Sequence, residues 1–486
     1  MALNPLSRRN TLRAVSRLAI ALLLLGAAFT LAACAPAVTG AAPKFVYNPA
    51  APTTPPERPV LSLKDDDRIL VLAPHPDDEV LATGGVIQQA LAQGLPVQVV
   101  FLTNGDNNEF AYLFFRKAFT LDPSSALDAG ATRTFEALRA ARELGLKAKD
   151  ESFLGYPDFG TLRIWLNRWG DREAFRSMFT EQNAVPYWFA QTPDAPYKGE
   201  AILADLKQVL IDFKPTKVFV SHPADTNPDH ESYYLFLRTA LWDLKDEVKA
   251  EVYPYLTHYG EWPQPRGLLM NAPHEPPAKF DEPGRWLVLP LEPTQVQKKL
   301  DAIKRHKTQY EASKVYLESY IRANELFDTV KDIPLTASSP SAIILPSGTG
   351  ISGAAPAPPE AYTDGAARRV RLDGDALVFS FELGQPSASG VKAQTNVMGY
   401  RGDRSFAEMP KLYLDIKGAN YKVYERRQRI PDESVKVSST STLTEVRIPL
   451  KLLGDPERVF VAAYTAAGDA PLDAMPWVVL DLTGGQ

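Results

Sequence analysis

Between residues 65 and 330 the hydrophobic positions follow two alternating patterns. Short aliphatic runs predict buried strands, and the segments between them repeat apolar residues at helical spacing. This alternation is typical of an α/β domain with a mostly parallel sheet covered by helices on both faces. We expect strands at 68–75, 96–103, 151–156, 217–221 and 252–259, and helices at 79–93, 131–145, 200–213 and 230–246.

Two longer insertions interrupt this alternation, at residues 105–130 and 160–198. The second is rich in aromatic residues, including Trp165, Trp169 and Trp188. Loops of this length on an α/β scaffold often shape a substrate site. An aromatic cluster beneath a long loop explains the same composition equally well.

The pattern changes after residue 330. Residues 331–362 are rich in Ser, Pro, Ala and Gly and predict a linker. Residues 363–486 show short strand patterns and little helical periodicity, which predicts a smaller all-β domain, a sandwich. Its aromatic side chains either stack on sugar rings or fill the sandwich core; they include Tyr413, Tyr421, Tyr424 and Trp477.

Charge and composition narrow the function classes. The 486 residues carry a formal net charge of -5, and the chain has no block of Lys and Arg. These features argue against nucleic acid as the natural partner. The hydrophobic fraction of 45% is ordinary for a globular protein.

The N-terminus has the pattern of an export signal. Basic Arg8 and Arg9 precede an apolar stretch at 18–31, which is too short to span a membrane comfortably. Small residues then lead to Cys34, and this ending resembles the lipidation box of bacterial lipoproteins. We therefore predict a signal peptide at 1–34 with lipidation of Cys34. A plain signal peptide with an incidental cysteine is the alternative.

Further expectations follow from the N-terminal region. The protein is exported and held at the cell membrane by a lipid anchor. The paired arginines also resemble a twin-arginine export signal, used by proteins that cross the membrane folded. Residues 35–64, rich in Pro, Ala and Thr, form a tether. Because Cys34 is the only cysteine, disulfides and thiolate metal sites are excluded.

The candidate chemistry begins at His75-Pro76-Asp77-Asp78-Glu79, directly after the first predicted strand. Open α/β sheets place ligands at the carboxyl ends of their strands. There His75 and Asp78 can hold a divalent metal, while Asp77 moves protons. The same residues also make a good helix start, since acidic groups complement the positive end of the helix dipole.

A third ligand decides between these interpretations. The strand at 217–221 runs into a segment that contains His222 and ends at Asp229-His230. This segment should open onto the same crevice, so we predict a metal site made by His75, Asp78 and His230. Two imidazoles and one carboxylate suit catalytic zinc, and Fe2+ suits the same set. His222 either supports the ligands from outside or is structural.

On these motifs residues 65–325 resemble the PIG-L/LmbE-type zinc-dependent N-acetylglucosaminyl deacetylases. The resemblance rests on motifs that occur in the expected order: 75–79, Arg133 with Glu136, 155–158, Asp229-His230 and 305–309. It implies a Rossmann-like fold, zinc bound by His75, Asp78 and His230, and Asp77 as general base. It further implies that Arg133 and Asp158 contact the sugar.

The chemistry of an acetamide fits these roles. A bound metal polarises the carbonyl and lowers the pKa of water, and Asp77 is placed to take the water proton. A carboxylate beside a metal and at a helix N-terminus tends to stay ionised. We therefore expect Asp77 to be charged.

One position departs from the family pattern. The family commonly has a histidine three residues before the last ligand, and this chain has Asn227. Asn227 either donates a hydrogen bond to an oxyanion or caps the following helix, and capping is slightly favoured. Asp77 then acts alone as acid, or His306 or His258 supplies the proton. We place His258 among the substrate-binding candidates as well.

The sequence leaves three functions open. The first is a metal-dependent deacetylase of an N-acetylated amino sugar in a glycan, glycolipid or glycoside. The second is a glycan-binding lipoprotein with weakened catalysis, because the C-terminal strands weakly resemble carbohydrate-binding and DOMON-like sandwiches. The third is a metal hydrolase of another amide or an ester.

Overall fold

The structure is a computed structural model of the 486-residue chain. It describes residues 57–107, 122–260, 262–336, 339, 343–346, 366–387, 391–431, 434–467 and 470–484. The predicted signal peptide, Cys34 and most of the predicted tether lie outside these residues. Within the described ranges, no helix has both the length and the hydropathy needed to cross a membrane.

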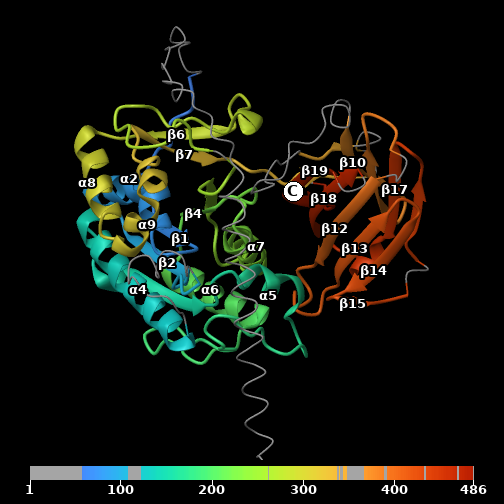
Figure 1. Ribbon diagram of the computed structural model, residues 1–486, viewed down its shortest axis with the longest axis horizontal. Coiled ribbons are helices and arrows are strands. Elements are labelled where there is room, and N and C mark those ends of the chain that lie inside the picture. The colour runs from blue at the N-terminus through green and yellow to red at the C-terminus, as the bar shows by residue number, and fades with distance from the viewer. Residues whose placement is uncertain are drawn as a thin grey trace, which may run out of the picture. The chain divides into compact units, whose positions relative to one another are not determined.

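A five-stranded parallel sheet forms the centre of the first domain, as predicted (Figure 1). Its strands lie in the order β3-β2-β1-β4-β5. They are rich in buried aliphatic and aromatic residues, as expected for strands covered on both faces. Their bounds are β1 Ile69–Ala73, β2 Val97–Thr103, β3 Glu151–Tyr156, β4 Lys217–Ser221 and β5 Glu251–Tyr255.

Helices cover both faces of this sheet. One face packs on α2 (Asp78–Ala92), α4 (Pro123–Leu144) and α8 (Pro293–Ile303). The other packs on α5 (Thr161–Asn167), α6 (Gly199–Phe213) and α7 (Pro228–Asp243). Alternate residues of β1 point to the two cores, with Ile69 and Val71 on one side and Leu70 and Leu72 on the other. The predicted α/β architecture is confirmed.

Helix α4 begins eight residues earlier than the sequence pattern predicted. The region 105–130 was expected to be an insertion, but the helix starts at Pro123. Asp122 caps it by accepting a hydrogen bond from the backbone N–H of Ser125, at 3.0 Å. An acidic cap followed by proline is a recognised helix start, so the signal was present. The first turns lack the apolar periodicity on which the prediction relied.

A two-stranded antiparallel sheet and one further helix complete the first domain. Strands β6 (Trp286–Pro290) and β7 (Asn324–Asp328) pair with each other, and α9 covers Lys307–Glu318. The end of the predicted tether also packs here, because Val60 forms a bridge with Val288 and Leu61 is buried. Residues 57–64 therefore belong structurally with the globular part.

The second domain consists of two mostly antiparallel sheets around a common core, and the predicted all-β fold is confirmed. One sheet has the order β16-β17-β11-β10-β9, and the other β15-β14-β13-β12-β18-β19-β8. The main strands are β10 Ala367–Asp373, β11 Ala376–Glu382, β12 Val391–Tyr400, β13 Lys411–Lys417, β14 Asn420–Glu425, β17 Leu443–Pro449, β18 Arg458–Ala467 and β19 Ala470–Asp481. The short strands are β15 Gln428–Arg429 and β16 Lys436–Ser439.

Two short strands lie inside the predicted linker. β8 (Ile333–Pro334) pairs in parallel with β19, and β9 (Ile343–Ile344) pairs with β10. These two-residue strands extend the two sheets of the second domain. They are too short to show a hydrophobic pattern, so only the paired structure reveals them.

The two domains share one apolar core. The core beneath α5, α6 and α7 continues into residues of the second domain. Trp165 of α5 stacks on Phe406 with ring centroids 4.8 Å apart, and it meets Phe460 edge-on at 5.4 Å. The aromatic insertion at 160–198 is therefore partly an interdomain packing element.

Candidate metal centre

The candidate site lies where β1 and β4 end. These strands are parallel neighbours in the sheet, with Ile69 opposite Lys217. After β1 the chain continues through α2 to β2 on one side of the pair, whereas after β4 it continues to β5 on the other side. Crevices at such points, where the strand order reverses, are common ligand sites in open α/β sheets. The segments after the two strands carry His75 and His230. This topology brings together residues that are 155 positions apart in the chain.

The three predicted metal ligands converge. The Nδ1 of His75 lies 3.2 Å from the Nε2 of His230, and these atoms lie 3.3 and 3.0 Å from the Oδ2 of Asp78. All three residues are buried. Two imidazole nitrogens and one carboxylate oxygen facing one point are the donor set of a catalytic zinc site, so the residues fit a divalent metal.

Carboxylates hold the opposite edge of the His75 ring. Its Nε2 lies 3.1 Å from the Oδ1 of Asp158 and 3.2 Å from the Oδ2 of Asp229. Asp229 is itself fixed by the backbone N–H groups of Phe159, at 2.6 Å, and Thr161, at 3.1 Å. A carboxylate on the far nitrogen fixes the tautomer and orientation of a metal-binding histidine. Asp158, predicted to contact the sugar, therefore also orients His75.

His230 is supported in the same way. Its Nδ1 lies 3.2 Å from the Oδ2 of Asp225 and 3.1 Å from the hydroxyl of Thr257. Asp225 also accepts hydrogen bonds from the backbone N–H groups of Thr257 and His258, at 3.1 and 2.9 Å. One buried carboxylate thus ties the segment after β4 to the segment after β5.

The pKa values reflect these close charge pairs. Burial opposes the charged form of His230, but Asp225 and Asp78 outweigh it and raise its pKa to about 9. Burial also opposes the charged form of Asp78, yet the two histidines lower its pKa. Because metal-bound imidazoles are neutral, binding must displace protons from this cluster.

Asp77 stands beside the ligands in a strained conformation. Its φ is 133°, a region that non-glycine residues rarely adopt, and such strain is often found at functional sites. Its side chain is 13% exposed, whereas that of Asp78 is 1% exposed. Burial, with the neighbouring Asp78 and Glu79 charges, raises its pKa to about 6 against the opposing effects of Arg133 and His306. This pKa is higher than the sequence argument implied, although Asp77 is still mostly ionised at pH 7.

Glu79 and His306 lie behind Asp77. The carboxylate of Glu79 accepts the backbone N–H of Asp77 at 2.9 Å and pairs with the Nε2 of His306 at 2.8 Å. His306 is fully buried at the start of α9. This arrangement makes His306 a positioning residue for the strained turn, and its predicted catalytic role stays a prediction.

Arg133 supports the same turn from α4. Its guanidinium donates to the backbone carbonyls of Pro76, at 2.7 Å, and Gly105, at 3.2 Å, and lies 3.7 Å from Asp77. Arg133 is 4% exposed. Its predicted contact with a sugar stays a prediction, because the contacts it makes here are with the protein.

Asn227 caps α7. Its side-chain oxygen accepts the backbone N–H of Asp229 at 2.9 Å, and Pro228 occupies the first helical position. The capping interpretation is confirmed. The oxyanion role of Asn227 stays a prediction.

His258 is the most open of the predicted site histidines, with 33% of its side chain exposed. It follows β5, and its ring meets His230 edge-on at 4.6 Å. Its Nδ1 lies 3.3 Å from Asp225 and 3.2 Å from the Thr257 hydroxyl. By contrast His222 pairs with Asp328 at 2.7 Å beside Trp286, so it is structural.

Several site residues were not predicted. Asp225 and Glu79 lie within segments that the motifs already marked. Their supporting contacts were not predicted, because the partner residues are distant in the sequence. Asp106 accepts a hydrogen bond from Tyr187 at 2.8 Å, which joins the two long insertions. Burial and the charge of Asp158 raise the pKa of Asp106 to about 7. No local sequence signal marks this pair.

Comparisons with known proteins find relatives that match part of the chain. The chain is 31% identical over 176 residues to 1D-myo-inositol 2-acetamido-2-deoxy-alpha-D-glucopyranoside deacetylase 1 of Saccharopolyspora erythraea, covering 35% of this chain and 52% of the relative. It is 22% identical over 261 residues to a glucosamine-6-phosphate deaminase-like protein of Bacteroides thetaiotaomicron, covering 51% and 36%. The chain thus spans about a third to a half of these curated relatives.

Solved structures with detectable similarity include the N,N'-diacetylchitobiose deacetylase from Pyrococcus horikoshii. It shares 18% identity with a TM-score of 0.33, over 54% of this chain and 82% of that one. A family model described as PIG-L, GlcNAc-PI de-N-acetylase, matches residues 70–241. That range runs from β1 almost to the end of α7 and includes all three candidate metal ligands. Over residues 70–241 the chain is therefore similar to the PIG-L family.

Proposed function

We propose that the protein is a metal-dependent hydrolase that removes the N-acetyl group from an N-acetylglucosamine-type sugar in a glycan, glycolipid or glycoside. The observation that carries this proposal is the convergence of His75, Asp78 and His230 beside Asp77, whose side chain is 13% exposed. The PIG-L family match over the same residues supports the substrate class.

The three ligands would hold zinc, and Fe2+ suits the same donors. When bound, the metal supplies Lewis-acid polarisation of the amide carbonyl and a lowered pKa for water. Asp77 accepts the proton of the attacking water. A carboxylate beside a bound metal tends to stay ionised at neutral pH, which suits the role of general base.

His258 is the better placed of the two candidate acids. It is partly exposed and lies against His230, whereas His306 is fully buried and bonded to Glu79. His258 would protonate the departing amine, and Asp225 would orient its ring through Nδ1. Asp77 alone remains the alternative source of this proton.

The test measures acetate release from N-acetylglucosamine and its glycosides by zinc-loaded protein. We expect turnover that a chelator abolishes and zinc restores. Asp77→Asn should lower kcat at least about a hundredfold, the scale of general acid–base catalysis. It should leave zinc content unchanged, because Asp77 is not a ligand.

Asp246→Asn, at an exposed position beyond α7, is the matched control and should keep full activity. Zinc-loaded protein that releases no acetate from a broad amino-sugar panel would contradict the proposal. Acetate release from esters but not from acetamides would favour the hydrolase of another bond. Sugar binding without any turnover would favour the glycan-binding lipoprotein.

A further inference from the structure

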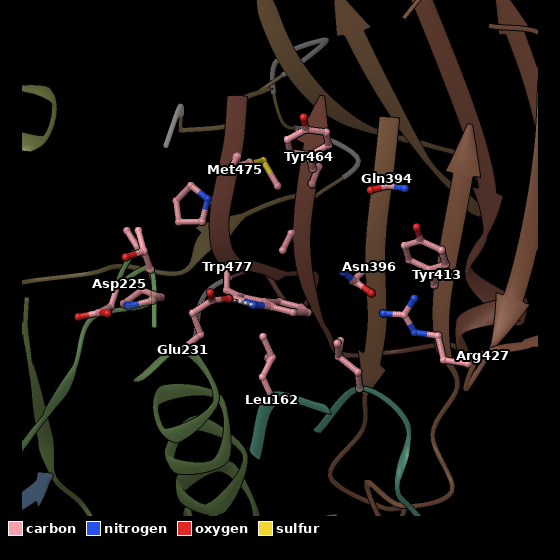
Figure 2. A pocket seen from close by; sticks show the side chains of 18 residues that line it. Leu162, Asp225, Glu231, Gln394, Asn396, Tyr413, Arg427, Tyr464, Met475 and Trp477 are labelled. Carbon is pink, nitrogen blue, oxygen red and sulfur yellow. Dashed lines mark hydrogen bonds between the residues drawn. The ribbon is translucent and has the colours of Figure 1, made fainter. Parts of the chain in front are cut away.

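A cavity of about 400 Å³ lies between the α/β domain and the seven-stranded sheet (Figure 2). Its walls come from α5, the segment after β4, the start of α7, and strands β12, β13, β18 and β19. This volume is in the range of small-molecule sites. The three candidate metal ligands do not line it, so it is distinct from the metal centre.

One wall is a patterned face of the sheet. Gln394 and Asn396 are two residues apart on β12, so their side chains lie on the same face of the sheet. Ala393 and Val397 point the other way, into the sandwich core. Figure 2 shows both amides on the cavity side, next to Tyr413 and Tyr464. The strand register explains this grouping, because Asn396 lies opposite Tyr413 and Gln394 opposite Tyr464.

The same face becomes apolar where the domains touch. Further along β12, Met398 and Tyr400 join the shared interdomain core, together with Phe460 of β18. The change from amides to apolar side chains occurs along a single strand. Ala462 lies opposite Asn396 on β18, and its small side chain leaves space for the cavity at this position. The cavity therefore has a mixed lining, with amide groups next to the apolar contact between the domains.

A basic residue stands at the end of the cavity near β14. The Arg427 guanidinium lies 4.4 Å above the ring of Tyr413, a cation–π contact. Arg426 and Arg427 form the β14–β15 turn with φ of 45° and 66°, positions that normally favour glycine or asparagine. In the part of the chain that the structure describes, no carboxylate lies within 4.0 Å of Arg427. Arg427 is exposed and lines the cavity, so its guanidinium is accessible to a ligand.

The opposite wall carries two carboxyl groups and apolar surface, and burial raises the pKa of one of these groups, that of Glu231, to about 8. Glu231 of α7 accepts a hydrogen bond from the indole N–H of Trp477 at 2.9 Å, which joins the two domains at the cavity. Asp225, which supports His230, also lines this wall, and Leu162 adds apolar surface. The cavity thus runs from the carboxyl groups of Glu231 and Asp225 to the guanidinium of Arg427 on the sandwich domain.

We infer that this cavity binds a pyranose oligosaccharide. Sugar hydroxyls both donate and accept hydrogen bonds, and the Gln394 and Asn396 amides do the same. The C–H faces of a pyranose pack on phenol rings such as Tyr413 and Tyr464. Arg427 donates to ring hydroxyls or to a uronate carboxylate. The sandwich domain is therefore a glycan-binding module whose site is completed by the α/β domain.

The inference does not depend on deacetylase activity, and its test reads binding alone. Full-length Asp77→Asn protein, in which the probes are not consumed, is titrated calorimetrically with chitotetraose and with tetragalacturonate. We expect at least one probe to bind. Asn396→Leu and Tyr413→Ala should each weaken it about tenfold or more, a loss of about 1.4 kcal/mol. Arg427→Gln should weaken the uronate probe more than the neutral one.

Lys436→Ala is the matched control, because Lys436 is exposed on the other sheet of the same domain. It should leave both affinities unchanged. Thermal unfolding of every variant checks that it is folded. Because leucine is similar in size to asparagine, the affinity of Asn396→Leu can be measured even if Tyr413→Ala does not fold. If neither probe binds the folded full-length protein, the inference is overturned. Binding that Asn396→Leu leaves intact overturns it as well, since the sugar then lies elsewhere.

Discussion

At the residue scale, buried carboxylates outside the ligand set hold the candidate metal centre in shape. Asp225 contacts His230, and Asp158 and Asp229 contact His75. Each imidazole is thereby fixed through the ring nitrogen that faces away from the candidate metal position. Such outer partners raise the basicity of ligands and keep their orientation.

Asp225→Asn tests this support. The substitution keeps the size of the side chain and removes the charge beside His230. We expect zinc affinity to fall about 10- to 100-fold, as for other carboxylate partners of metal-binding histidines. Competition with a fluorescent chelator measures the dissociation constant, with Asp246→Asn as control. An unchanged dissociation constant would show that Thr257 alone orients His230.

Asn227 separates a capping role from a catalytic one. Asn227→Ala removes the acceptor for the Asp229 N–H and should lower the free energy of unfolding by about 1 kcal/mol. Asn227→Asp keeps the acceptor and should retain stability, as measured by urea denaturation. A variant that is stable but has a strongly reduced kcat would support the oxyanion role, because an aspartate cannot donate that hydrogen bond.

At the element scale, α5 and α7 serve two regions at once. Thr161 at the start of α5 donates to Asp229 near the metal centre, and Trp165 four residues later packs into the sandwich domain. Helix α7 carries His230 on one side and Glu231, bonded to Trp477, on another. These two helices therefore connect the metal centre to the second domain.

Phe406→Ala tests the strength of this link. Phe406 is 1% exposed and packs against Trp165, Trp169 and Phe460. Its removal should cost about 3–5 kcal/mol, the usual range for a buried phenylalanine. Calorimetry should show one cooperative transition at a lower Tm. Trp188→Ala, at a position 86% exposed, should change stability by less than about 0.5 kcal/mol.

The elements themselves were largely predictable. The five parallel strands agree with their predicted ranges to within a few residues, because buried parallel strands have continuous apolar sequence. The early start of α4, the helix α5 inside the predicted insertion at 160–198, and the elements β6, α8, α9 and β7 were not predicted. The two short strands within 331–362 were not predicted either, because β8 and β9 exist only through their pairing with β19 and β10.

At the scale of the whole molecule, the two domains share an apolar core and a cavity. The export and lipidation signals at the N-terminus are predictions from the sequence. We propose that the protein is exported and anchored through Cys34, which would hold both the metal centre and the glycan cavity at the cell envelope. Residues 35–56 would then span the distance to the membrane as a tether.

Cys34→Ser tests the anchor. Lipidation requires the thiol, so the wild-type protein should fractionate with membranes and carry lipid, whereas the variant should appear in the soluble exported fraction. Mass spectrometry of the N-terminal peptide and fractionation of cells measure both. A wild-type protein that is soluble and unlipidated would leave the plain signal peptide as the explanation.

The sequence by itself determined the fold class, the three candidate metal ligands and the position of Asp77. Hydrophobic periodicity and residues next to strand ends are local features, and parallel strands must bring their carboxyl ends to one edge. The tertiary structure alone decided which carboxylates support His75 and His230, why Asp77 is strained, and where the glycan cavity lies. Those features arise from contacts between distant segments, such as Asp106 with Tyr187 and Glu231 with Trp477, which no local pattern encodes.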